Sequence, residues 1–166
     1  MHIDLSDLID YTDWERQKWH DWFAKNGDHI LNISLGPRGD GRFQKIGDWI
    51  RHIFSAEKRY VERLSNTPLS DPSSIPADNV EALFAFGRQS REEFKQFAAT
   101  ISEADANRAV EFKLMNTVIT VTPKKIFTHV LIHEMRHWAQ IATLLRLNGV
   151  RENEFHDFVL SPAMRG

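Results

Sequence analysis

The segment HEMRH at positions 133–137 places two histidines four residues apart, with a glutamate directly after the first. Side chains four apart lie on one face of a helix, so His133 and His137 can bind one metal ion together. The same five residues match the H-E-x-x-H pattern of zinc peptidases, in which the glutamate acts as general base. The segment therefore indicates a metal site, and it leaves open which kind of site it is and what Glu134 does there.

A third metal ligand has to come from elsewhere in the chain. His129 precedes His133 by four residues, but helix rise separates it from His137 by about 12 Å. His52 is the candidate, because it lies in the middle of another helical segment, at the edge of an apolar stripe. Helix bundles build metal sites from facing helices in this way. On the pattern alone, a histidine at such a position is more often a packed or surface residue than a metal ligand.

The chain contains no cysteine, so nitrogen and oxygen atoms must hold any metal. Three neutral imidazoles suit a divalent ion, with zinc or nickel as the first choice and iron, manganese or copper as alternatives. A catalytic site keeps at least one coordination position for water or substrate, whereas a structural site is closed by four protein ligands. The number of ligands therefore separates an enzyme from a structural metal protein.

Four segments with helical periodicity must position these residues, and they predict an all-α, four-helix bundle. The first covers about 5–26 and the second about 43–65. The glycine-rich stretch 28–42 between them is expected to be a loop. Three prolines within 66–79 predict a surface connection to the third helix.

The third helix is expected to begin after Asp78, which would cap it together with Glu81 in a capping box. Alternating and β-branched residues in 109–122 predict a short β-hairpin or an extended insertion. An isolated hairpin is only marginally stable, so this one must pack on the helices or on a partner chain. The last helix has Thr122 as its cap and runs to about Asn148. We expect one domain over residues 1–166.

Composition narrows the class of protein. The chain has 166 residues, of which 42% are hydrophobic and 27% charged, enough for both a packed core and a solvated surface. A formal net charge of -2 gives no electrostatic reason to expect a nucleic-acid partner. The N-terminus lacks the apolar core of a signal peptide, and no apolar run approaches the ~20 residues that cross a bilayer. We therefore expect a cytoplasmic globular protein without a membrane partner.

Two segments together carry a family resemblance: IGDWIRHIFSAEKRYVERL (46–64) and THVLIHEMRHWAQIATLLRLNG (128–149). The first has a histidine followed five residues later by a glutamate, and the second has three histidines four apart, followed by a glutamine. In both respects the chain resembles the DinB/YfiT-like family of metal-dependent enzymes. Its length, its helix order and the extended stretch before the last helix agree as well. The resemblance implies a four-helix bundle in up-down-down-up order.

The resemblance also implies that His52, His133 and His137 are the metal ligands. Five further residues are expected beside these ligands or around the pocket: Trp49, Glu57, His129, Glu134 and Gln140. The sequence departs from the commonest family pattern at Arg136, Trp138 and Ala139. These departures leave the three ligands intact, but they change the expected shape of the adjacent pocket.

A zinc metallopeptidase remains a minor alternative. The metzincin extension of H-E-x-x-H requires glycine at 140 and histidine at 143, where this chain has Gln140 and Thr143. Glu152 or Glu154 could supply a third ligand, but little chain is left there to build a substrate cleft. In a bundle without peptidase activity, Glu134 is expected to face solvent or to pair with an exposed base such as Arg136.

Two functional hypotheses follow. The first is a metal-dependent enzyme acting on a small molecule; the resemblance adds a low-molecular-weight thiol as partner and S-transfer or isomerisation as reaction. The second is a non-enzymatic, stress-related bundle that binds metal for structure and works as a dimer. The resemblance also implies a homodimer in either case.

Overall fold

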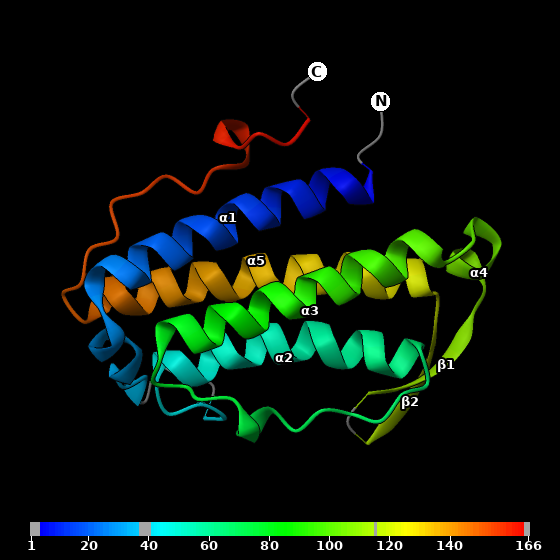
Figure 1. Ribbon diagram of the computed structural model, residues 1–166, viewed down its shortest axis with the longest axis horizontal. Coiled ribbons are helices and arrows are strands. Elements are labelled where there is room, and N and C mark those ends of the chain that lie inside the picture. Colours follow the sequence, from blue (N-terminus) through cyan, green and yellow to red (C-terminus); the bar gives the residue numbers. More distant parts are fainter. Residues whose placement is uncertain (1–3, 37–40, 115, 165–166) are drawn as a thin grey trace.

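The structure, a computed structural model, describes residues 4–36, 41–114 and 116–164. Four long helices form a bundle: α1 (Leu5–Asn26), α2 (Ile46–Leu64), α3 (Val80–Thr100) and α5 (Pro123–Leu147). Helix α2 packs against α3 and α5, and α1 packs against the same two helices. α1 and α5 run in one direction and α2 and α3 in the other (Figure 1), which confirms the expected up-down-down-up order. The parallel pair α2 and α3 needs the long connection 65–79, which returns along the outside of the bundle.

A two-stranded antiparallel hairpin, β1 (Val110–Leu114) and β2 (Thr117–Val121), precedes α5. It packs on the helices through Phe112, which is buried and stacks on Tyr60 of α2 with ring centroids 5.5 Å apart. The predicted hairpin is therefore confirmed. The short helix α4 (Glu103–Asn107) before it was not predicted; the side chain of Ser102 caps this helix by accepting the backbone N–H of Asp105.

The predicted loop 28–42 contains a short 3-10 helix, η1 (Asp28–Asn32), whose Ile30 and Leu31 are buried. Ser34 forms a β-bridge with Lys45, and for that reason α2 begins at Ile46 rather than near residue 43. Two further 3-10 turns lie outside the bundle, η3 (Pro72–Ser74) and η4 (Phe158–Leu160). The C-terminal tail that carries η4 lies along α1 (Figure 1).

The predicted cap of the third helix is wrong by one residue. Asn79, not Asp78, is the N-cap, because its side chain accepts the backbone N–H of Ala82 at 2.8 Å. Asp28 accepts the backbone N–H of Val80, also at 2.8 Å, and so satisfies a second unpaired donor of the first turn. Asp78 is exposed and takes no part in the cap.

Replacing Asn79 with alanine should lower the free energy of unfolding by about 1 kcal/mol, because the first turn of α3 loses a side-chain acceptor. The same replacement at Asp78 should change the free energy of unfolding by less than about 0.5 kcal/mol. Urea denaturation of the two variants measures both values. A larger loss for the Asp78 variant would contradict the observed cap.

Two apolar clusters fill the interior, one toward each end of the bundle. In the first, Trp138 of α5 stacks on Trp19 of α1 with ring centroids 5.2 Å apart, and both are almost fully buried. Charged side chains are buried as well, including Glu15 and Arg16 on the inner face of α1. None of the helices in the described ranges is long and apolar enough to span a membrane.

Candidate metal centre

The three histidines proposed as ligands lie together between α2 and α5. His52 comes from the middle of α2, and His133 and His137 lie one turn apart on α5. Each offers one ring nitrogen, and these atoms all lie within 4.8 Å of one another. His133 is central: its Nε2 atom lies 3.2 Å from Nε2 of His52 and 2.9 Å from Nε2 of His137.

These distances and the ionisation of His133 fit a metal ion. Two nitrogen ligands that are each about 2.0–2.1 Å from one ion lie roughly 2.9–3.4 Å apart at tetrahedral or octahedral angles. The pKa of His133 is lowered to about 2, first by burial and then by His137 and His52. The ring therefore stays neutral and keeps a lone pair, as metal binding requires. Within the described ranges, no carboxylate joins the group as a fourth ligand.

Two side chains compete for the other ring nitrogen of His137. The indole N–H of Trp49 points at Nδ1 from 2.7 Å, and Oε1 of Gln140 lies 2.6 Å from the same atom. An unprotonated Nδ1 accepts the indole N–H of Trp49, whereas a protonated Nδ1 donates to Gln140 and the contact with Trp49 is lost. If a metal were bound at Nε2, Nδ1 would carry the proton, and Gln140 would then orient the ring. Trp49 and Gln140 thus both contact the ring nitrogen of His137 that lies away from His133.

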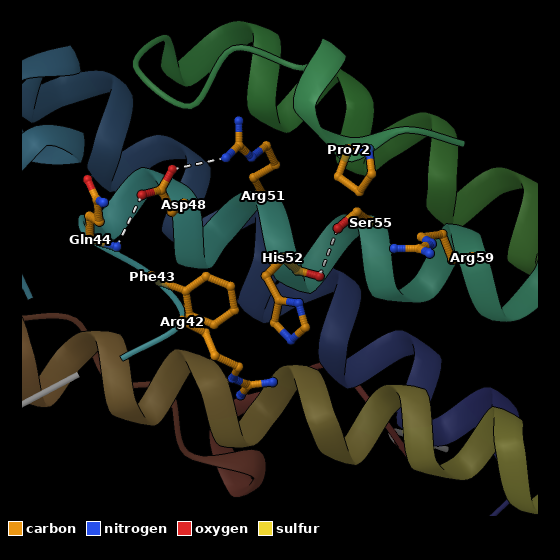
Figure 2. Close-up of a pocket in the computed structure, with 9 residues that line it drawn as sticks. All are labelled: Arg42, Phe43, Gln44, Asp48, Arg51, His52, Ser55, Arg59 and Pro72. Carbon is orange, nitrogen blue, oxygen red and sulfur yellow. Dashed lines mark hydrogen bonds and ion pairs between the residues drawn. The ribbon is translucent and has the colours of Figure 1, made fainter. Parts of the chain in front are cut away.

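His129 lies next to the three-histidine group without joining it. Its ring centroid is 5.7 Å from that of His133 and 5.6 Å from that of Tyr60, and the side chain is exposed. His52, by contrast, lines a cavity of about 460 Å³ along α2. Figure 2 shows the ring of His52 pointing from α2 toward α5, with Phe43 beside it. One of the three histidines, His52, therefore borders a cavity large enough for a small molecule.

The expectation that Glu134 faces solvent or pairs with Arg136 is wrong. Glu134 is 2% exposed, and its carboxylate forms a bidentate pair with Arg16 of α1, with N–O distances of 2.8 and 2.6 Å. Arg91 of α3 reaches Oε2 at 2.5 Å, and the indole N–H of Trp138 donates to Oε1 at 3.1 Å. A carboxylate engaged in this way is not available as a general base, so the peptidase interpretation loses its central residue.

Glu57 of α2 belongs to the same buried ion cluster, which we define as Arg16, Glu57, Arg91 and Glu134. Arg91 lies 3.0 Å from Oε2 of Glu57, and Arg16 lies 3.3 Å from Oε1. Two positive and two negative groups balance each other at the centre of the bundle. Burial would raise the pKa of Glu134, but Arg16 and then Arg91 outweigh it and hold this pKa below its ordinary value. Glu134 is therefore ionised within the cluster.

The other carboxylates considered for a peptidase lie elsewhere. Glu154 pairs with Lys18 of α1 at 3.0 Å, and Oε1 of Glu152 lies 3.4 Å from Nε2 of His156. Neither is part of the three-histidine group. The structure therefore does not bring a downstream glutamate to the HEMRH segment.

Arg16 and Arg91 are the residues of this region that the sequence analysis did not single out. A signal for both exists in the sequence. Arg16 falls on the inner face of α1, which continues with the buried Trp19 and Phe23. Arg91 follows the buried Gly87 by four residues and precedes the buried Phe94 by three. A charged residue in register with an apolar face indicates a buried partner, although it does not say which one.

Glu15 neighbours this cluster and makes the stability depend on pH. Its pKa is raised to about 8 by burial first and by Glu134 second, against an opposing contribution from Trp19. Between about pH 4.5 and 8 the folded protein keeps a proton that the unfolded chain has released. The contribution of Glu15 to the free energy of unfolding therefore falls as pH rises through this interval.

Replacing Glu15 with glutamine should remove this dependence. The free energy of unfolding of the variant, relative to that of the wild type, should rise by about 2–4 kcal/mol from pH 5 to pH 8, because one unit of pKa shift corresponds to about 1.4 kcal/mol. Urea denaturation of both proteins at pH 5 and at pH 8 measures this rise. Comparing the two proteins at the same pH cancels the contributions of the ionisable groups that they share. A constant difference would show that Glu15 ionises normally in the fold.

Comparison with known proteins identifies the family. No curated protein gives a significant match to the chain. The model of the DinB family matches residues 1–162, which is nearly the whole chain. This agrees with the bundle, with the hairpin before α5 and with the three histidines between α2 and α5. The chain belongs to the DinB family.

Proposed function

We propose that this protein is a metal-dependent enzyme that acts on a small molecule, with a divalent ion held by His52, His133 and His137. The observation that carries the proposal is the convergence of three histidine ring nitrogens, one of them from a residue that lines a cavity. Three protein ligands leave coordination positions open, which is typical of a catalytic rather than a structural site. Zinc or nickel is the first choice of metal, and iron, manganese or copper would also suit imidazole ligands.

The protein's own residues have defined tasks in this proposal. Gln140 would accept the Nδ1 proton of His137 in the metal-bound protein and so leave Nε2 of this ring as the nitrogen that would hold the ion. The cavity beside His52 admits the substrate. A bound divalent ion would lower the pKa of a coordinated water or thiol, or polarise a carbonyl. Since a thiolate is a soft ligand that such ions bind well, a low-molecular-weight thiol is the proposed co-substrate, and S-transfer or isomerisation the proposed reaction.

A thiol-transfer assay tests the proposal. The protein, loaded with zinc or nickel, is mixed with a small thiol and 1-chloro-2,4-dinitrobenzene. The thiolate sulfur forms a bond to the ring carbon, chloride leaves, and the thiol proton goes to the buffer. We expect the rate of thioether formation to exceed that of the metal-free protein by more than about tenfold, and to fall to that level in His52→Ala. Equal rates with and without metal, for every thiol tried, would contradict a thiol-dependent enzyme.

A further inference from the structure

The cavity beside His52 carries an excess of positive charge. Three arginines line it, Arg42, Arg51 and Arg59, and Asp48 is the acidic residue among the described residues that line it. Arg51 and Arg59 come from α2, the same helix as His52. Because His52 and Arg59 are seven residues apart, they lie on one face of α2, about 10 Å apart along its axis.

Arg59 has hydrogen-bond donors that no partner in the described residues uses. Its Nε atom is buried and has no hydrogen-bond partner, and the guanidinium forms no ion pair with the residues described. Figure 2 shows this guanidinium turned back along α2 toward Ser55 and the cavity that His52 lines. Asp71 of the connection is the acidic group nearby: after its hydrogen bonds to Ser73, the charges of Arg59 and Arg51 help to lower the pKa of its carboxyl, without a direct ion pair to Arg59. A buried donor without an acceptor costs free energy, which a bound anion would recover.

Arg51 lines the same cavity, and more of its hydrogen-bond donors already have partners in the protein. Its Nη2 atom pairs with Asp48 at 3.1 Å, and its Nη1 atom donates to the carbonyl oxygen of Ile75 at 3.2 Å. A guanidinium has five N–H donors, so donors remain for a ligand. Arg42 also lines the cavity but has other interactions, and the inference does not depend on it.

We propose that this cavity binds the oxyanion group of the substrate, a carboxylate or a phosphate, through Arg59 with support from Arg51. The inference rests on the proposed function, because the reactive atom of the same molecule would lie at the three-histidine centre. The guanidinium of Arg59 points back toward His52, so the two ends of the substrate are less than about 10 Å apart. The substrate class is therefore a short molecule with one anionic end and one metal-seeking end.

Two thiols of matched length test the preference. Binding of 3-mercaptopropionate and of 3-mercapto-1-propanol to the metal-loaded protein is measured by calorimetry. We expect the carboxylate to bind more tightly by about tenfold or more, since a charge-assisted contact to a guanidinium is among the strong hydrogen bonds. Arg59→Gln should reduce this ratio to less than about threefold, while metal content and binding of the neutral thiol stay unchanged.

Arg63→Gln is the matched control. Arg63 lies one turn further along α2 and points over the ring of Phe112, with its guanidinium carbon 5.8 Å from the ring centroid, outside the cavity. This variant should keep the wild-type ratio. Equal binding of the two thiols by the wild type, or an unchanged ratio in Arg59→Gln, would overturn the inference while leaving the metal proposal intact.

A second arm separates this inference from the metal proposal and identifies the oxyanion. The metal-free protein is titrated with propionate and with methyl phosphate, and backbone amide shifts near Arg59 are followed by NMR. Shifts that saturate in the wild type but not in Arg59→Gln support the inference even if the protein binds no metal. The anion that saturates at the lower concentration indicates the class of substrate. If neither anion gives saturating shifts in the wild type, the inference is overturned.

Discussion

Replacing Glu134 with alanine should lower the free energy of unfolding by about 3–5 kcal/mol, one of the largest losses expected for a single substitution in this protein. The carboxylate is 2% exposed and is shared by Arg16 and Arg91. Without it, the two buried guanidinium groups keep Glu57, and Arg91 keeps only a longer contact of 3.5 Å with the partly exposed Asp13, so the positive charge at the centre of the bundle is no longer balanced. The measurement is urea denaturation followed by circular dichroism.

Arg136→Ala is the control for this prediction. Arg136 lies two residues further along α5 and is exposed, so its loss should change the free energy of unfolding by less than about 0.5 kcal/mol. Metal content of the Glu134 variant should match that of the wild type under conditions where both are folded. A stable Glu134 variant that binds metal but loses all activity would favour a direct catalytic role and contradict the structural role assigned to this residue.

Replacing His133 with alanine should weaken metal binding by more than about 100-fold, because its Nε2 atom is the one closest to both other ligands. Replacing Gln140 should weaken it by only about 10–100-fold, since Gln140 orients His137 without touching the ion. Replacing His129 should leave the affinity unchanged. Competition with a chromophoric chelator at one fixed pH measures all three.

The order of these three effects is what the geometry predicts. A His129 variant that loses metal as completely as the His133 variant would show that the ligand set is wrong. Full retention of metal by the His133 variant would show that the ion binds elsewhere in the protein. Either outcome is independent of whether the protein has the proposed activity.

The sequence predicted the elements of the site well, because they depend on local periodicity. Histidines four apart on α5 lie on one helix face whatever surrounds them. His52 was the candidate third ligand from its place in another helical segment, and the family resemblance supported that choice. The four helices, the proline-rich connection and the hairpin likewise follow from patterns within each segment. What required the structure was the partner of each side chain across the bundle.

Glu134 illustrates that limit. Its position next to a candidate ligand, in an H-E-x-x-H segment, suggested either solvent or a role at the metal. The structure places it among Arg16 and Arg91, which are 118 and 43 residues away in the chain. No local pattern connects residues that far apart. The buried cluster becomes visible only when α1, α3 and α5 are packed together.

Arg59 illustrates the same limit on the side of the cavity. In the sequence it is one of several charged residues near the end of an amphipathic helix, where a solvated position is the usual outcome. In the structure Pro72 of the connection lines the same cavity, which helps to explain why Nε of Arg59 is buried. The charge of the cavity thus depends on where a segment without regular structure returns along the bundle.

The central claim is that one divalent ion binds to His52, His133 and His137 together. Crystals of protein prepared without chelator or histidine tag, measured at the absorption edge of the bound metal, test it most directly. We predict one anomalous peak about 2.0–2.2 Å from the Nε2 atoms of all three histidines, with no fourth protein ligand. A peak held by Glu152 or Glu154 instead of His52, or no peak at the three histidines at full metal loading, would contradict it.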